Sequence, residues 1–147
     1  MNQKLKIFVI MFIICFCGFS QLYSQEQTAY QKKLIEIKRS FLKECLIASY
    51  GQENWSEKLE TGLNNYSEKE LNESLPMLKI GLAGLPKETA VKIVNKFIDD
   101  VANAKKIKST DATKKEFDDA REKKINEFVS ELKEMKKLLI EMGIEGY

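Results

Sequence analysis

Histidine, the side chain used most often as an acid or base at neutral pH, is absent from this 147-residue chain. Without it there is no Ser-His-Asp triad, no Cys-His nucleophile pair and no imidazole ligand for zinc, iron or haem. Carboxylates, lysines, hydroxyls and cysteines remain, and their spacing singles out no site. We therefore expect a protein that is not an enzyme and has no catalytic, cofactor-binding or metal-binding residues.

Adjacent carboxylates occur twice, as Asp99-Asp100 and Asp118-Asp119. Neighbouring residues on a helix point about 100° apart, so neither pair converges on one ligand. A di-iron site of the bundle type needs Glu-x-x-His motifs, and a calcium loop needs alternating acids around a glycine. Because the chain has neither pattern, both pairs are expected to lie on a solvated helix face.

Two other residues have both a chemical and a structural interpretation. Cys45 is a candidate reactive or partner-linking thiol, but it lies on an apolar stripe between Phe41 and Ala48, which favours packing in the core. Trp55, the single tryptophan, is a candidate binding anchor, but its place at a predicted helix start favours a plug at the end of a bundle.

Three Asn-x-Ser triplets begin at Asn54, Asn65 and Asn72. In a eukaryotic secreted protein they would be glycan acceptors. Two of them overlap predicted helix caps, where asparagine and serine are favoured for a different reason. Glycosylation is therefore a conditional alternative to a purely structural role.

The first 24 residues have the layout of a secretory signal peptide. Lys4 and Lys6 form a basic start, residues 7–19 are an uninterrupted run of 13 apolar or small residues, and a short polar stretch ends at Ser24. A spanning helix needs about 20 apolar residues, so no stable membrane span is expected after processing. Cleavage after Ser24 is favoured over cleavage after Ser20, because it leaves five residues between the cut and the apolar run.

The leader also contains two of the three cysteines, Cys15 and Cys17. Lipidation at either is disfavoured, since Ile14 and Phe16 are bulky where a lipoprotein signal has a small residue. After processing, Cys45 is the only thiol, so the secreted or periplasmic domain must fold without an internal disulfide.

Removal of the leader changes the charge balance as well. The full chain has 24 basic and 22 acidic residues, and the loss of Lys4 and Lys6 leaves 22 of each. A neutral domain has no net field that attracts nucleic acid, and we expect no nucleic-acid partner.

Residues 25–147 are expected to form one all-α domain. Each long segment repeats its apolar residues at steps of three and four, and none alternates with period two. We predict a helical bundle of four to five helices with short connections. The stripes are Tyr30, Leu34, Ile37, Phe41, Cys45 and Ala48; Trp55, Leu59, Leu63 and Tyr66; Leu71, Leu75, Leu78 and Leu82; Val91, Val94, Phe97, Ile98 and Val101; and Ile125, Phe128, Leu132, Met135, Leu139 and Met142.

Local signals predict where these helices begin and end. Gly51 favours the end of the first helix, because glycine adopts a left-handed conformation at little cost. Asn54 with Glu57, and Ser67 with Glu70, have the spacing of capping boxes.

Two of the predicted helices are unusual. Pro76 interrupts the leucine stripe without a change of phase, which predicts one kinked helix rather than two. The last helix runs from Ser109-Thr110-Asp111 to about Met142, with coiled-coil spacing in its second half only. At 1.5 Å per residue it would extend about 48 Å. We expect either that its charged half projects beyond the bundle or that it breaks near Lys123.

These features favour a small exported helical module that acts by contact with another protein or with a second copy of itself. Acidic residues dominate in residues 53–73 and basic residues in 105–124, so these stretches could pair within or between molecules, although solvated surface is the simpler interpretation. The alternative function is a carrier for an apolar ligand such as a fatty acid, in an inter-helix cavity loosened by Pro76, Gly81 and Gly84.

Overall fold

A computed structural model describes residues 27–141, and every regular element in that range is helical. The expected leader and its cleavage point lie outside the described residues. Five α-helices follow one another, so the all-α prediction is confirmed for this range. They are α2 (Ala29–Tyr50), α3 (Glu57–Asn64), α4 (Glu68–Ala83), α5 (Lys87–Ala104) and α6 (Ala112–Glu141), with single-turn 3-10 helices η1 (Gln52–Asn54) and η2 (Lys105–Ile107) between them.

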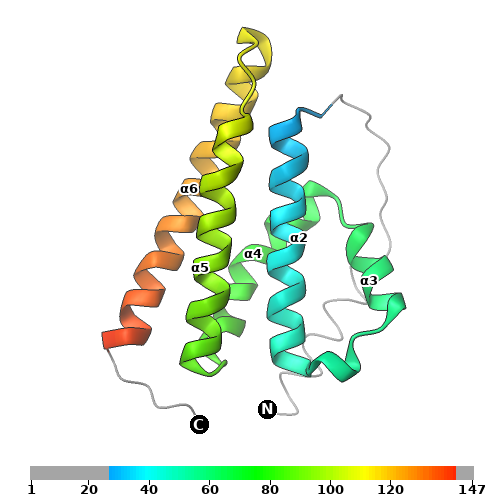
Figure 1. The fold of residues 1–147 in the computed structure, drawn as a ribbon, viewed down its shortest axis with the longest axis vertical. Coiled ribbons are helices and arrows are strands. Elements are labelled where there is room, and N and C mark those ends of the chain that lie inside the picture. Colours follow the sequence, from blue (N-terminus) through cyan, green and yellow to red (C-terminus); the bar gives the residue numbers. More distant parts are fainter. Residues whose placement is uncertain (1–26, 142–147) are drawn as a thin grey trace.

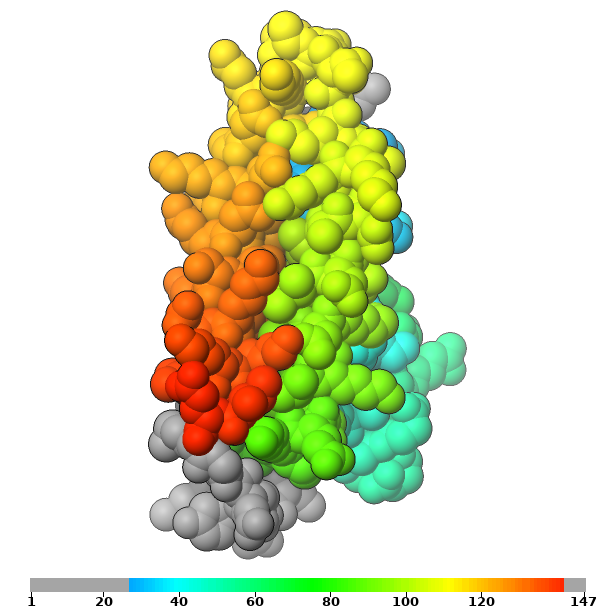
Figure 2. All heavy atoms as spheres, turned by 60° about the vertical axis from the view of Figure 1, so that its left-hand side comes forward, coloured from blue at the N-terminus to red at the C-terminus, as the bar shows by residue number. Residues whose placement is uncertain are grey.

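α2, α5 and α6 run roughly along the long axis of the molecule, and α4 passes behind α2 and α5 at an oblique angle (Figure 1). α2 packs on both α4 and α5, and α6 packs mainly on α5. Figure 2 shows α5 and α6 lying against each other along the long axis of the molecule. α4 and α6 touch only lightly, as do α4 and α5, and α2 and α6.

Three phenylalanines join three of these helices at the centre of the core. The ring centroids of Phe41 on α2 and Phe97 on α5 are 4.5 Å apart, and Phe128 on α6 lies 6.1 Å and 5.7 Å from them. The two contacts of Phe128 are edge-to-face, an arrangement that aromatic quadrupoles favour. The rings therefore add a directional contact to the hydrophobic burial that holds α2, α5 and α6 together.

Most residues of the predicted apolar stripes are buried, but Ala48, Trp55, Leu59 and Met135 are only half-buried, and Met142 lies outside the described residues. All four leucines of the α4 stripe are covered, as are Val94, Phe97 and Val101 of α5. On α5 the covered face is turned slightly from the prediction, so that Ala90 and Ile93 are buried while Val91 and Ile98 are only half-buried. Burial of one face per helix is what stabilises these short elements.

Two of the predicted helix ends are confirmed. Gly51 follows α2 with a φ of 92°, a conformation that side-chain-bearing residues rarely adopt. Ser67 begins α4 with a complete capping box: its Oγ accepts from the N–H of Glu70 at 3.3 Å, and its own N–H donates to Glu70 Oε2 at 2.6 Å.

The predicted capping box of Asn54 with Glu57 is wrong. Ser56 is the cap of α3, and its side chain accepts from the N–H of Leu59. The amide of Asn54 is already used, because it donates to the carbonyl of Tyr50 at the end of α2 at 2.6 Å. The asparagine thus closes the preceding helix, and the next serine opens the following one.

The two unusual helices are both continuous. α4 runs through Pro76 as a single helix, and α6 extends over 30 residues without a break near Lys123. Residues 112–117 at the start of α6 are all exposed, and Figure 1 shows this end rising beyond the start of α2. Of the two alternatives for the long helix, projection of its charged half is therefore the one observed.

Candidate functional site

The side of the bundle between α4 and α6 forms a groove of about 690 Å³. It lies between the two outer helices because α4 packs mainly on α2 and α6 packs mainly on α5. Pro76 lines the groove from the middle of α4. Its ring removes the N–H that would bond to the carbonyl of Asn72, so α4 is weakest in its own hydrogen bonding at this point.

The floor of the groove is apolar, while its edges are polar. Leu75 of α4 and Ile125 and Phe128 of α6 form the floor, and each belongs to the hydrophobic core. Phe117, at the start of α6, stands at one end of the groove with 62% of its surface exposed. A single exposed apolar side chain is ordinary on a protein surface, so Phe117 matters here because it adjoins the apolar floor of the groove.

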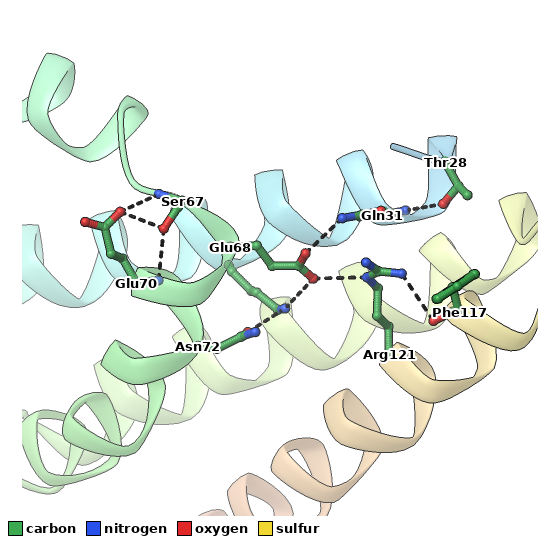
Figure 3. A network of polar contacts seen from close by, with 9 residues as sticks. Thr28, Gln31, Ser67, Glu68, Glu70, Asn72, Phe117 and Arg121 are labelled. Atoms are coloured by element: carbon green, nitrogen blue, oxygen red, sulfur yellow. Dashed lines mark hydrogen bonds and ion pairs between the residues drawn. The ribbon is translucent and has the colours of Figure 1, made fainter. Parts of the chain in front are cut away.

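Two ion pairs cross from α4 to α6 at the two ends of the groove. At the first, Arg121 Nε lies 3.2 Å from Glu68 Oε1, and Gln31 of α2 donates to the other oxygen of Glu68 at 2.9 Å (Figure 3). At the second, Lys79 pairs with Glu131. These pairs bridge the two helices, and the floor between them is formed by side chains that the core already buries for the most part.

Lys38 of α2 lies beneath the first ion pair and lines the groove, although only 5% of its surface is exposed. Its Nζ donates to Asn72 Oδ1 at 2.7 Å and lies 3.9 Å from Glu68 Oε1, which is within ion-pair range but beyond hydrogen-bond range. Burial lowers the pKa of the Lys38 ammonium, and the negative charge of Glu68 offsets part of that effect. The groove therefore contains a cation that is largely desolvated and incompletely paired.

The charges that line the groove balance overall but not locally. The cationic residues are Lys38, Lys69, Arg121 and Lys124, and the anionic ones are Glu68, Glu73, Glu127 and Glu131. Of the predicted pairing between the acidic stretch 53–73 and the basic stretch 105–124, the structure has one direct ion pair, Glu68 with Arg121. The two stretches are thus linked at the groove, and most of their other charges face solvent.

Asp118 is a correction to the expectation of two solvated carboxylate pairs. It is fully buried, and its two oxygens accept from Thr28 Oγ1 at 2.8 Å and from the N–H of Ser109 at 3.0 Å. Its neighbour Asp119 is exposed and pairs with Lys108. The prediction of a solvated Asp118 rested on its polarity alone. Its position, seven residues before Ile125 on the same helix face, places it on the buried side of α6.

Cys45, Trp55 and Asp99, the other residues considered as candidates for a chemical role, lie in environments that favour structural roles or solvation. Cys45 is buried, and burial raises the pKa of its thiol to about 12, which supports the packing interpretation. Trp55 is half-buried against the core, with its Nε1 donating to Glu60 Oε2 at 2.6 Å and Lys43 5.6 Å from its ring centroid. Asp99 is exposed, as expected.

The three asparagines of the Asn-x-Ser triplets are all exposed. Asn65 ends α3, and Asn54 caps the end of α2 through its side chain. Asn72 lies on α4 beside the groove, with its carbonyl oxygen bonded to Lys38. Glycosylation at these positions stays a prediction.

Lys38 is a groove residue that the sequence reasoning missed. A signal for it was available: it lies four residues after Leu34 and three before Phe41, and so falls on the buried face of α2. A lysine at such a position is unusual enough to mark a buried polar contact.

Within residues 27–141, no cluster of three or more acidic or cysteine side chains is placed to hold a metal ion. None of the helices in that range is long and apolar enough to cross a lipid bilayer. Comparisons with protein-family models, with curated proteins and with solved structures give no significant match. The groove is therefore interpreted from its own geometry and charge.

Proposed function

We propose that this protein is an interaction module whose α4–α6 groove binds an amphipathic helix of a partner protein. The observation that carries the proposal is the combination of an apolar floor, an exposed Phe117 at one end and ion pairs at both ends. A helix laid between two helices can insert its apolar side chains between theirs, as in ridges-into-grooves packing.

The dimensions of the groove suit about three turns of a partner helix. Glu68 and Lys79 are eleven positions apart on α4, which corresponds to roughly 16 Å along the helix. Apolar residues at positions i, i+3, i+4 and i+7 of a bound helix span about 10 Å, so they fit within this length. The polar face of that helix would then meet the charged edges of the groove and the solvent.

The groove favours a helix over a free acyl chain as its occupant. A carrier encloses most of its ligand in an apolar cavity. Here charged residues of both signs line the edges, and the floor side chains Leu75, Ile125 and Phe128 are already mostly covered by the core. An acyl chain would lie against charge on two sides, whereas a helix supplies its own polar groups there. A carrier function stays the alternative that the test below distinguishes.

The test is selection of helical peptides on the purified protein, followed by affinity measurements with two matched variants. Phe117→Ala removes the aromatic side chain at the groove. Ile140→Ala removes an exposed apolar side chain from the same helix, outside the groove. We expect Phe117→Ala to weaken binding of the selected helix by about tenfold or more, as for an aromatic hot spot, and Ile140→Ala to change it little.

Several results would contradict the proposal. One is a selection that enriches no helix, and another is an equal effect of the two substitutions. Native mass spectrometry of protein purified without delipidation tests the alternative that the protein carries a fatty acid. A bound fatty acid that is displaced by no peptide would favour the carrier.

A further inference from the structure

We propose that the end of the groove near Arg121 is a carboxylate-binding site, so that the partner helix carries an aspartate or glutamate whose side chain is bound by Lys38 and Arg121. This inference rests on the proposed function and specifies the chemistry of the partner. It is carried by unused donors at the groove floor and by the local excess of positive charge.

Lys38 supplies the unused donors. An ammonium group has three N–H bonds, and in the structure one of them is used by Asn72 Oδ1 at 2.7 Å. The nearest carboxylate oxygen, Glu68 Oε1, is 3.9 Å away, too far for a hydrogen bond. Since the side chain is almost fully buried, its remaining donors gain little from bulk water. An acceptor that enters from the groove would form hydrogen bonds with the unused N–H donors of the Lys38 ammonium group.

Arg121 is the second donor at the same place. Its Nε is bound to Glu68, and its Nη1 donates to the carbonyl of Phe117 at 3.3 Å. A guanidinium has five N–H bonds, so these two contacts leave others for a planar carboxylate. Figure 3 shows Arg121 and Glu68 meeting between α6 and α4, with Asn72 close by.

The ion pairs at this end of the groove also favour an anion. Glu68 is the carboxylate that Lys38 and Arg121 share, with its Oε1 3.9 Å from Lys38 Nζ and 3.2 Å from Arg121 Nε. Two positive charges thus share one negative charge. A carboxylate from the partner would reduce this imbalance in a setting where water screens charge weakly.

An acidic side chain of a helix fits this site better than a bulkier anion. The donors lie at the floor of a groove whose neighbouring surface is apolar, on Leu75, Ile125 and Phe128. A carboxylate on a short aliphatic stem, flanked by leucine-like residues one turn away on the same helix, would satisfy both surfaces at once.

The test uses one randomised library of helical peptides and three forms of the protein. These are the wild type, Lys38→Met and Lys136→Met. The last is a matched control, since Lys136 also donates to an asparagine, Asn95 Oδ1 at 2.6 Å, and lies outside the groove. We expect peptides selected on the wild type and on Lys136→Met to share an acidic residue at one fixed register position, and peptides selected on Lys38→Met to lack it. A Glu→Gln change at that position should weaken binding to the wild type by about tenfold or more, as expected for a hydrogen-bonded charge.

A second measurement keeps the inference testable if Lys38→Met does not fold. The side-chain ¹⁵Nζ signal of Lys38 in the wild type should shift when the Glu peptide binds and not when the Gln peptide binds. Selected helices that need Phe117 but share no acidic position would overturn this inference and leave the proposed function intact. An acidic preference that persists in folded Lys38→Met would overturn it too. Failure to select any helix would overturn both proposals.

Discussion

The phenol of Tyr30 is fully buried, and its hydroxyl has no hydrogen-bond partner among the described residues. A buried donor without a partner costs about 1–3 kcal/mol of stability. We therefore expect Tyr30→Phe to leave the free energy of unfolding unchanged or to raise it by about 1 kcal/mol. Urea denaturation at pH 7 measures this difference. A loss of stability well beyond that range would mean that the hydroxyl makes a favourable bond.

The burial of the Tyr30 phenol also predicts that the free energy of unfolding falls at alkaline pH. Burial, with a contribution from nearby Glu122, raises the pKa of this phenol from 10.0 to about 12 in the folded chain. Between these two values the unfolded chain releases the proton and the folded chain keeps it, so stability falls as the pH rises from 10 to 12. Tyr30→Phe should make the decline over this range shallower in urea titrations at successive pH values. An unchanged decline would contradict the assignment.

Cys45 should be inert in the folded protein. Burial raises the pKa of its thiol from 9.0 to about 12, and the thiolate is the reactive form. We expect iodoacetamide to modify it at pH 8 at least about a hundredfold more slowly in the native protein than in urea, since reaction then requires opening of the core. Mass spectrometry of the alkylated Cys45 peptide follows both rates. Equal rates would show that the thiol is accessible in the folded protein and would support the interpretation of Cys45 as a reactive thiol.

At the scale of the elements, the Asp118 side chain links three segments of the chain through hydrogen bonds. Its oxygens bind Thr28 at the start of α2 and the N–H of Ser109 in the segment before α6, while its backbone belongs to α6. Asp118→Ala leaves the two donors without their acceptor, and we expect it to lower the free energy of unfolding by about 2–3 kcal/mol. Asp118→Asn, which keeps one acceptor oxygen, should have a smaller effect.

The neighbouring carboxylate is the control for this prediction. Asp119 forms an exposed ion pair with Lys108, so Asp119→Asn should cost less than about 1 kcal/mol. Thermal or urea unfolding of the variants compares the two positions. Equal effects of Asp118→Ala and Asp119→Asn on the free energy of unfolding would show that the hydrogen bonds of Asp118 do not stabilise the fold.

The helices themselves were predictable from the spacing of apolar residues, because burial of one face is what selects a helix here. The Ser67 capping box and the stop at Gly51 depend on local chemistry and were predicted as well. The cap at Asn54 was missed because its side chain had two competing partners, the end of α2 and the start of α3. Buried Lys38 and Asp118 were missed because a polar residue is assigned to the surface unless its tertiary partners are known.

At the scale of the whole molecule, the groove could not have been derived from the stripes. Each stripe shows that a helix packs, but it does not say on which neighbour. That α4 packs on α2 while α6 packs on α5 is set by tertiary contacts between segments far apart in sequence. The open side between α4 and α6 follows from that choice, together with the ion pairs of Arg121 and Lys79 that bridge the two helices.

The central claim, that a helix binds between α4 and α6, is tested most directly by paramagnetic broadening. A selected helical peptide with a nitroxide at its centre is added to the ¹⁵N-labelled protein, and the loss of each amide signal reports its distance from the label. We predict the strongest broadening in residues 72–77 of α4 and 120–128 of α6, and little in α3, which packs on the other side of α2. Broadening centred on α3, or spread evenly over the chain, would contradict the claim.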